Sequence, residues 1–191
     1  MANKFRENHP KRTFTKVYQQ YVSYKPYLAT DFFNRCGYTD CSDFWFGGVN
    51  NFHIDHFVPW KNYPANPKLK IDYQNLVYCC SYVNILKSND ETDYIDPCNV
   101  DFNNHFNWDV SGNIEPVATS TSANYMYKKL KLFMRRYQII WMLDSILERM
   151  KKLESAIKNP NNLAVKTELQ VLHSDLSMEM TSYIDYLKKN Q

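Results

Sequence analysis

The spacing of apolar residues in the last third of the chain is the feature that most constrains its fold. Between Ser122 and Lys158, apolar side chains recur at steps of three and four residues, the period of an amphipathic helix. The positions are Leu130, Phe133, Tyr137, Ile140, Leu143, Leu147, Met150 and Ile157. A second such series consists of Leu169, Leu172, Leu176, Met180, Tyr183 and Leu187. Between the two series, Asn159 is a natural cap and Pro160 a natural first helical residue. The sequence therefore predicts a two-helix hairpin over residues 122–190, whose apolar stripes must be covered by each other, by the rest of the chain or by a partner.

The chain before residue 118 has a different pattern, with short β-prone runs separated by turns. Pro26 can occupy the first turn of a short helix that runs to about Asn34. The runs "NFHIDHFV" and "YQNLVYCC" are typical of strands, and "SYVNILKSND" of a short helix with Ser81 as its N-cap. "WDVSGNIE" suggests a hairpin around Ser111 and Gly112. We expect an α+β protein, with one region at 1–117 and a helical region at 118–191.

Composition narrows the class of protein. A chain of 191 residues can bury one core without disulfides, and four glycines with a high aromatic content argue against disorder. The start of the sequence is charged and no long apolar run follows, which argues against a signal peptide and a membrane span. We therefore expect a cytoplasmic protein. The five cysteines then indicate free thiols or metal ligands. The middle of the chain is acidic and both ends are basic, a layout compatible with a cation site beside a polyanion, although charge also varies along ordinary chains.

The segment "NFHIDHFVPWKN" gathers groups that could perform hydrolysis. The imidazole of His56 suits a proton acceptor near neutral pH, and the carboxylate of Asp55 supplies a hard oxygen for a divalent cation. The amide oxygen of Asn84 could complete the protein's part of such a site, which favours Mg²⁺ or Mn²⁺. In a regular strand His53 and Asp55 would share one face, and Ile54 and His56 the other, unless the strand bends.

These residues resemble the HNH endonuclease family. The matching positions, over roughly residues 32–90, are Asp55, His56, Pro59, Asn75, Leu76, Cys80, Asn84 and Lys87. The resemblance implies a ββα-metal nuclease core with flanking helices and the C-terminal two-helix hairpin. It also implies hydrolysis of DNA phosphodiester bonds, with His56 as general base and a Mg²⁺ or Mn²⁺ ion held by Asp55 and Asn84. Asn75 would hold the loop that orients His56, Lys87 would brace the helix or meet a phosphate, and His53 would have a supporting role near the metal.

The chain also resembles small stand-alone HNH nucleases of bacterial defence systems. This resemblance implies that it acts as an antiviral effector beside a separate ATPase or sensor subunit. The apolar stripe of the predicted hairpin could then dock that partner, or could join copies of this chain in a homo-oligomer.

Many HNH proteins also bind a structural zinc through two pairs of cysteines. Cys36, Cys41 and Cys80 fall near three of those positions, whereas Val83 occupies the fourth. Three thiolates leave a tetrahedral zinc site incomplete, and Cys98 could supply the fourth ligand if the following turn folds back. The alternative is that these cysteines pack as small apolar side chains.

Two basic segments are candidates for binding nucleic acid. Lys128, Lys131 and Arg135 have the i, i+3, i+7 spacing of one helical face and could neutralise phosphates. The N-terminal segment interleaves basic residues with aromatic ones, at Lys4, Arg6, Lys11, Arg12 and Lys16. Each basic face could instead simply be solvated. Two alternative functions remain open: a module that binds nucleic acid or a partner without cutting, and a hydrolase using Cys79 or Cys80 with His105.

Overall fold

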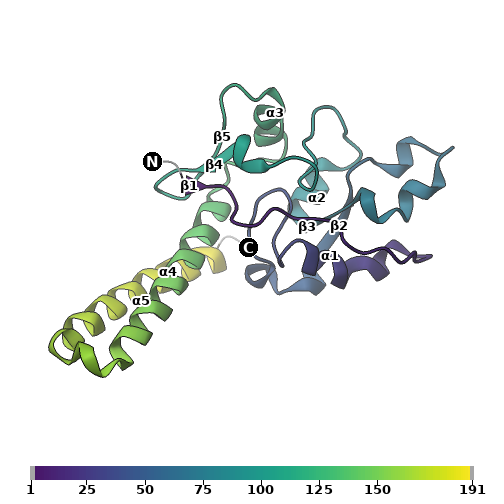
Figure 1. Cartoon of the computed structure of the whole chain (residues 1–191). Coiled ribbons are helices and arrows are strands. Elements are labelled where there is room, and N and C mark those ends of the chain that lie inside the picture. Colours follow the sequence, from purple (N-terminus) through teal and green to yellow (C-terminus); the bar gives the residue numbers. More distant parts are fainter. Residues whose placement is uncertain (1–2, 190–191) are drawn as a thin grey trace. The chain divides into compact units, whose positions relative to one another are not determined.

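The computed structural model describes residues 3–189, which form two compact units that meet between Tyr137 and Gln138. The first unit is a mixture of short helices and two small antiparallel sheets, and the second is helical (Figure 1). The expected α+β class is therefore confirmed. The division between the units lies twenty residues beyond the boundary that we placed at residue 117, because the helix over Thr121–Lys129 belongs to the first unit.

A hairpin of two strands followed by a helix forms the centre of the first unit. Strand β2 (Phe52–His56) pairs with β3 (Leu76–Cys80) in antiparallel register, with Phe52 opposite Cys80 and His56 opposite Leu76. All five residues of β3 are buried, which explains why its sequence is continuously apolar. Helix α2 (Ser81–Lys87) follows at once, and both α2 and α1 (Lys25–Asp31) contact the hairpin. The predicted order of strand, loop, strand and helix is confirmed, although Cys80 rather than Ser81 is the N-cap.

A second sheet joins the beginning of the chain to residues 106–116. Strand β1 (Asn3–Lys4) pairs with β4 (Phe106–Trp108), which pairs with β5 (Ile114–Pro116). Gly112, with a φ of 82°, lies in the turn between β4 and β5, so the predicted hairpin is confirmed. The ring of Phe5 stacks on Trp108 at a centroid distance of 5.6 Å, and this aromatic contact fixes the start of the chain to the sheet.

Two arginines of the N-terminal segment lie in the interior rather than on a binding surface. The Arg6 guanidinium donates to the Gly37 carbonyl at 2.8 Å. The Arg12 guanidinium donates to the carbonyl of Leu76 at 2.8 Å and pairs with Asp96 at 2.9 Å. Both side chains are only 2 % exposed, so the interpretation of Arg6 and Arg12 as phosphate contacts is wrong. They hold the N-terminal segment against the hairpin and its neighbours instead.

The helical pattern predicted over residues 122–158 is broken in the structure. Helix α3 (Thr121–Lys129) ends before Lys131, whose φ of 50° is left-handed, and the Leu132 amide donates to the Tyr127 carbonyl at 2.9 Å. Helix α4 (Arg135–Lys158) begins after this turn. Leu130 and Leu132 are both buried, and residues two apart face different sides of a continuous helix, so the turn allows both to enter the core.

The second unit contains most of α4 and all of α5 (Lys166–Lys189), joined through a short 3₁₀ segment, Pro160–Val165. The Asn159 side chain accepts from the Asn161 amide at 3.0 Å, which confirms its predicted capping role. Glu154 of α4 and His173 of α5 approach to 3.7 Å, so the two helices run beside each other as a hairpin (Figure 1). No helix within residues 3–189 is long and apolar enough to cross a membrane.

Candidate active site

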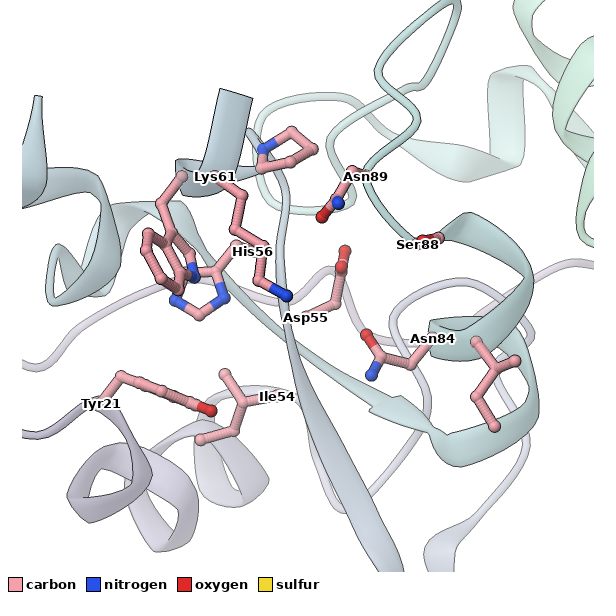
Figure 2. Close-up of a pocket in the computed structure, with 11 residues that line it drawn as sticks. Tyr21, Ile54, Asp55, His56, Lys61, Asn84, Ser88 and Asn89 are labelled. Atoms are coloured by element: carbon pink, nitrogen blue, oxygen red, sulfur yellow. The ribbon is translucent and has the colours of Figure 1, made fainter. Parts of the chain in front are cut away.

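An open cavity of about 450 Å³ lies beside the end of β2 in the first unit. Its walls come from β2, the loop after it, the N-terminal segment, and α2 with the turn that follows α2 (Figure 2). The lining residues include Asp55, His56 and Asn84, which the sequence predicted to act together. Figure 2 shows these three side chains around a common space.

His56 is the last residue of β2, and its ring is held by the loop that leads to β3. Its Nε2 lies 2.9 Å from the carbonyl oxygen of Lys70. Because a carbonyl can only accept, Nε2 carries the proton of the neutral ring and Nδ1 keeps a free lone pair. The pKa of His56 is lowered, chiefly because burial disfavours its charged form. The hydrogen bond to the Lys70 carbonyl opposes this shift, and the charges of Lys87 and Lys70 add to it. His56 is therefore a neutral imidazole at pH 7 that is able to accept a proton.

Asn75 fixes two points of the loop that follows this histidine. Its side-chain oxygen accepts from the Val58 amide at 2.8 Å, and its nitrogen donates to the carbonyls of Val58 and Leu69 at 2.9 and 3.0 Å. Leu69 immediately precedes Lys70, so Asn75 also positions the carbonyl that orients His56. Asn75 does not line the cavity and is buried, in agreement with the loop-holding role that the resemblance implies.

Asp55 lies at the buried base of the cavity. Its carboxylate accepts a hydrogen bond of 2.6 Å from the Tyr38 hydroxyl and lies 3.2 Å from the Lys87 ammonium group. Burial raises the pKa of Asp55 to about 6, against the opposing effects of Lys87 and Tyr38, which favour the ionised form. Both close contacts are to Oδ2, and Oδ1 has a longer one, 3.4 Å from Lys87. A carboxylate has about four acceptor positions, so Asp55 retains the capacity to bind a cation.

His53 and Asn84 contact each other at the opposite side of the site. Nδ2 of Asn84 lies 3.2 Å from Nδ1 of His53. This contact uses the nitrogen of the carboxamide, and Figure 2 shows the Asn84 oxygen on the side of Asp55 with the nitrogen turned away. His53 does not line the cavity; through this contact it orients the Asn84 oxygen.

Lys87 is fully buried, so it braces the site and does not meet a phosphate. Its Nζ donates to the carbonyl oxygens of His56 and Phe57 at 3.0 and 3.1 Å and pairs with Asp55. The Lys87 ammonium group therefore links the end of α2 to the Asp55 carboxylate and to the backbone of His56, the proposed base. Of the two roles that we considered for this residue, only bracing is compatible with its position.

The regular alternation of a strand would place Asp55 and His56 on opposite faces, yet both line the cavity. His56 ends the strand, and the chain turns away after it into a loop that reaches Trp60. The contribution of Tyr38 was not predicted, since nothing in its local sequence indicates a contact with Asp55. Lys61 and Trp60 were also missed as cavity residues; their only signal was that they follow Asp55, His56 and Pro59 directly in the sequence.

The cysteines proposed as zinc ligands do not come together as a set of four. Cys36 and Cys80 are buried neighbours with their sulfurs 4.0 Å apart. Cys98 lies elsewhere, with its amide bonded to Asp96 and its carbonyl to His9. Within residues 3–189 there is no group of three or more His, Cys, Asp or Glu side chains that could hold a metal ion, so the set Cys36, Cys41, Cys80 and Cys98 is not assembled.

The remaining predicted residues lie outside the cavity. Lys128, Lys131 and Arg135 are exposed, but they do not form a helical face, because the chain turns between α3 and α4 at Lys131. That these residues bind nucleic acid stays a prediction, but it is no longer supported by their sharing one helical face. The thiol alternative has no geometric support: Cys79 and Cys80 are fully buried, and Nδ1 of His105 contacts the Ser120 hydroxyl at 2.7 Å.

Comparison with protein-family models, with curated proteins and with solved structures found no match for this chain. The function must therefore be inferred from the residues around the cavity and the contacts that hold them.

Proposed function

We propose that this chain is a divalent-metal-dependent HNH endonuclease that hydrolyses DNA phosphodiester bonds with His56 as general base. The observation that supports the proposal best is the convergence of Asp55, His56 and Asn84 on one cavity. They come from a strand and a helix separated by a long loop, and they are the three residue types that this chemistry needs. The β2–β3–α2 unit is, on this proposal, the ββα-metal core of the family.

The residues of the chain prepare a base for attack on phosphorus. The Lys70 carbonyl holds the proton of His56 on Nε2, so that Nδ1 can take a proton from water. The water oxygen then bonds to phosphorus as the bond from phosphorus to the leaving oxygen breaks. The lowered pKa keeps this ring neutral before the reaction. Asn75 and Lys87 act as positioning residues, because they fix the carbonyl and the backbone around His56 without touching substrate.

The donor set fits Mg²⁺ or Mn²⁺ better than a softer metal. One carboxylate and one carboxamide oxygen offer hard ligands, and the open cavity leaves room for the waters and phosphate oxygens that Mg²⁺ retains. Asp55 and Asn84 would hold the ion, and the bound ion would stabilise negative charge on the phosphate and on the leaving oxygen. The buried Lys87 beside Asp55 keeps that carboxylate ionised more readily than burial alone would allow.

Metal dependence tests the proposal directly. We expect the purified protein to nick or linearise plasmid DNA in Mg²⁺ or Mn²⁺ and to lose this activity completely in EDTA, with recovery when excess Mg²⁺ is added. Gel analysis of supercoiled plasmid measures the result. DNA binding without cutting would favour the non-cleaving binding module, and cleavage that persists in EDTA would contradict the role of Asp55 and Asn84.

Cleavage should also fall at acid pH. Protonation of His56 removes the base, and protonation of Asp55, with its pKa of about 6, removes a metal ligand, so both groups must be deprotonated. We expect log(kcat/KM) to rise with pH until Asp55 is ionised, above about pH 6, and then to level off, with a limiting slope at acid pH and low Mg²⁺ that exceeds about 1. High Mg²⁺ should reduce that slope towards about 1, because metal binding competes with the proton on Asp55. Initial rates at constant ionic strength measure this profile, and a rate that rises on acidification would exclude His56 as base.

A further inference from the structure

We infer that Lys61 is a substrate-contacting residue of this site, whose ammonium group binds the oxygens of the phosphate to be cleaved. The inference rests on the proposed function and names a group that the family resemblance did not supply. Lys61 lines the cavity together with Asp55, His56 and Asn84. Figure 2 shows its amine reaching into the space between His56 and Asp55.

Charge in the cavity singles out this lysine. Among the residues that line the cavity, Lys61 is the one lysine or arginine. Lys87 is buried and occupied by Asp55 and two carbonyls, and the Lys70 ammonium lies over the Trp60 ring at 4.9 Å. A phosphodiester entering the cavity needs compensation for its own charge and for the charge that develops during attack. Lys61 is placed to provide it.

The backbone that carries Lys61 is held firmly, although its side chain is exposed. The next residue, Asn62, donates from its side chain to the Asn89 carbonyl at 3.0 Å, and the Tyr63 hydroxyl donates to Glu91 at 3.0 Å. These bonds connect the loop after β2 to the segment after α2. The attachment point of Lys61 is therefore fixed relative to Asn84 and His56, which reduces the entropy lost when its ammonium group binds a phosphate.

The ammonium group itself is available. The structure shows no hydrogen bond or ion pair of the Lys61 side chain with any residue in the described part of the chain, 3–189. A structural lysine would be engaged in the manner of Lys87. The Lys61 ammonium group is therefore free to bind an anion that enters the cavity beside His56.

The test compares Lys61→Gln with Lys68→Gln, which removes the same charge from an exposed lysine on the same loop but outside the cavity. We expect Lys61→Gln to lower the kcat for plasmid cleavage by about 10- to 100-fold, and Lys68→Gln to lower it by less than about threefold. Lys61→Arg, which keeps the charge, should retain most of the activity. Equal activities of the two glutamine variants would overturn the inference and leave the proposed nuclease function intact.

Binding separates failure of the inference from failure of the function. The affinity of each variant for a labelled DNA duplex is measured in Ca²⁺ at several salt concentrations. This measurement does not depend on cleavage. Lys61→Gln should reduce the slope of log K against log[salt] by about 1, and Lys68→Gln by less. If the wild-type protein binds DNA through Lys61 but never cuts it, the nuclease function is refuted and the phosphate-binding role of Lys61 is supported. A wild-type protein that neither binds nor cuts would refute both.

Discussion

His56→Ala abolishes metal-dependent DNA cleavage while the protein stays folded; this is the expected result with the largest effect on activity. Loss of a positioned general base typically lowers the rate by about 10²- to 10⁴-fold. The ring also contacts Tyr21 and Trp60, with centroid distances of 4.8 and 6.4 Å, so the substitution leaves a space in the cavity wall. The rate of plasmid nicking in Mg²⁺ is the measurement.

A matched control separates catalysis from general damage. His173→Ala removes a histidine from α5, outside the first unit, and should leave cleavage within about twofold of the wild type. Thermal unfolding followed by circular dichroism checks that His56→Ala remains folded at the assay temperature.

Chemical rescue gives a readout that a merely structural histidine would not produce. Added imidazole can enter the space left by His56→Ala and accept a proton from water there. We expect it to restore part of the activity of this variant, more strongly as the pH rises through the pKa of free imidazole. Full activity of His56→Ala without imidazole would refute the assigned base.

The local order of elements around the site was predictable because each element has a strong local signal. Apolar and polar residue types alternate along β2 from Phe52 to Asp55, β3 is continuously apolar, and α2 follows β3 without a linker. The convergence of Asp55, His56 and Asn84 was expected from the resemblance and not from this order alone. Strand β3 returns the chain to the beginning of β2, where Cys80 lies opposite Phe52, and α2 then brings Asn84 to the cavity.

Contacts between distant parts of the chain were not predictable from local pattern. Tyr38 reaches Asp55, and Arg12 reaches Leu76 and Asp96, across long stretches of sequence that no spacing rule connects. A basic segment looks the same in a sequence whether its guanidinium groups face solvent or buried carbonyls. In this fold the guanidinium groups of Arg6 and Arg12 donate to backbone carbonyls of the interior, which no local pattern could indicate.

The broken helix near Lys131 shows how packing overrides periodicity. Leu130 and Phe133 match a helical series, but burial of both Leu130 and Leu132 requires a turn, and Phe133 is left 55 % exposed. The basic face expected from Lys128, Lys131 and Arg135 disappears with the helix that would have carried it.

Lys87→Met is expected to cause the largest loss of stability. The side chain is 0 % exposed, and removal of its charge leaves Asp55 buried with Tyr38 as its remaining close partner. Breaking a buried ion pair by removing one member typically costs about 3–5 kcal/mol in the free energy of unfolding. Lys68→Met, at an exposed position of the same unit, is the control and should change this free energy by less than about 0.5 kcal/mol. The free energy of unfolding of the first unit, obtained from its transition in urea, is measured for both variants.

The pH dependence of this loss identifies its cause. Because the folded-state pKa of Asp55 lies above its ordinary value, the wild type loses stability as pH rises towards about 6, and the loss then stops. Without Lys87 that pKa rises further, so the variant should continue to lose stability above pH 6, by up to about 1.4 kcal/mol per pH unit. The difference between variant and wild type should therefore be larger at pH 8 than at pH 5.5.

A double-mutant cycle isolates the pair from the other contacts of Lys87. Asp55→Asn removes the charge that Lys87 compensates and keeps an acceptor for the Tyr38 hydroxyl. Asp55→Asn combined with Lys87→Met should be more stable than the sum of the single changes predicts, by about 1–3 kcal/mol, and should lose the excess pH dependence. Additive single effects would mean that Lys87 acts mainly through the carbonyls of His56 and Phe57, and that the ionisation of Asp55 is set by its burial and by Tyr38.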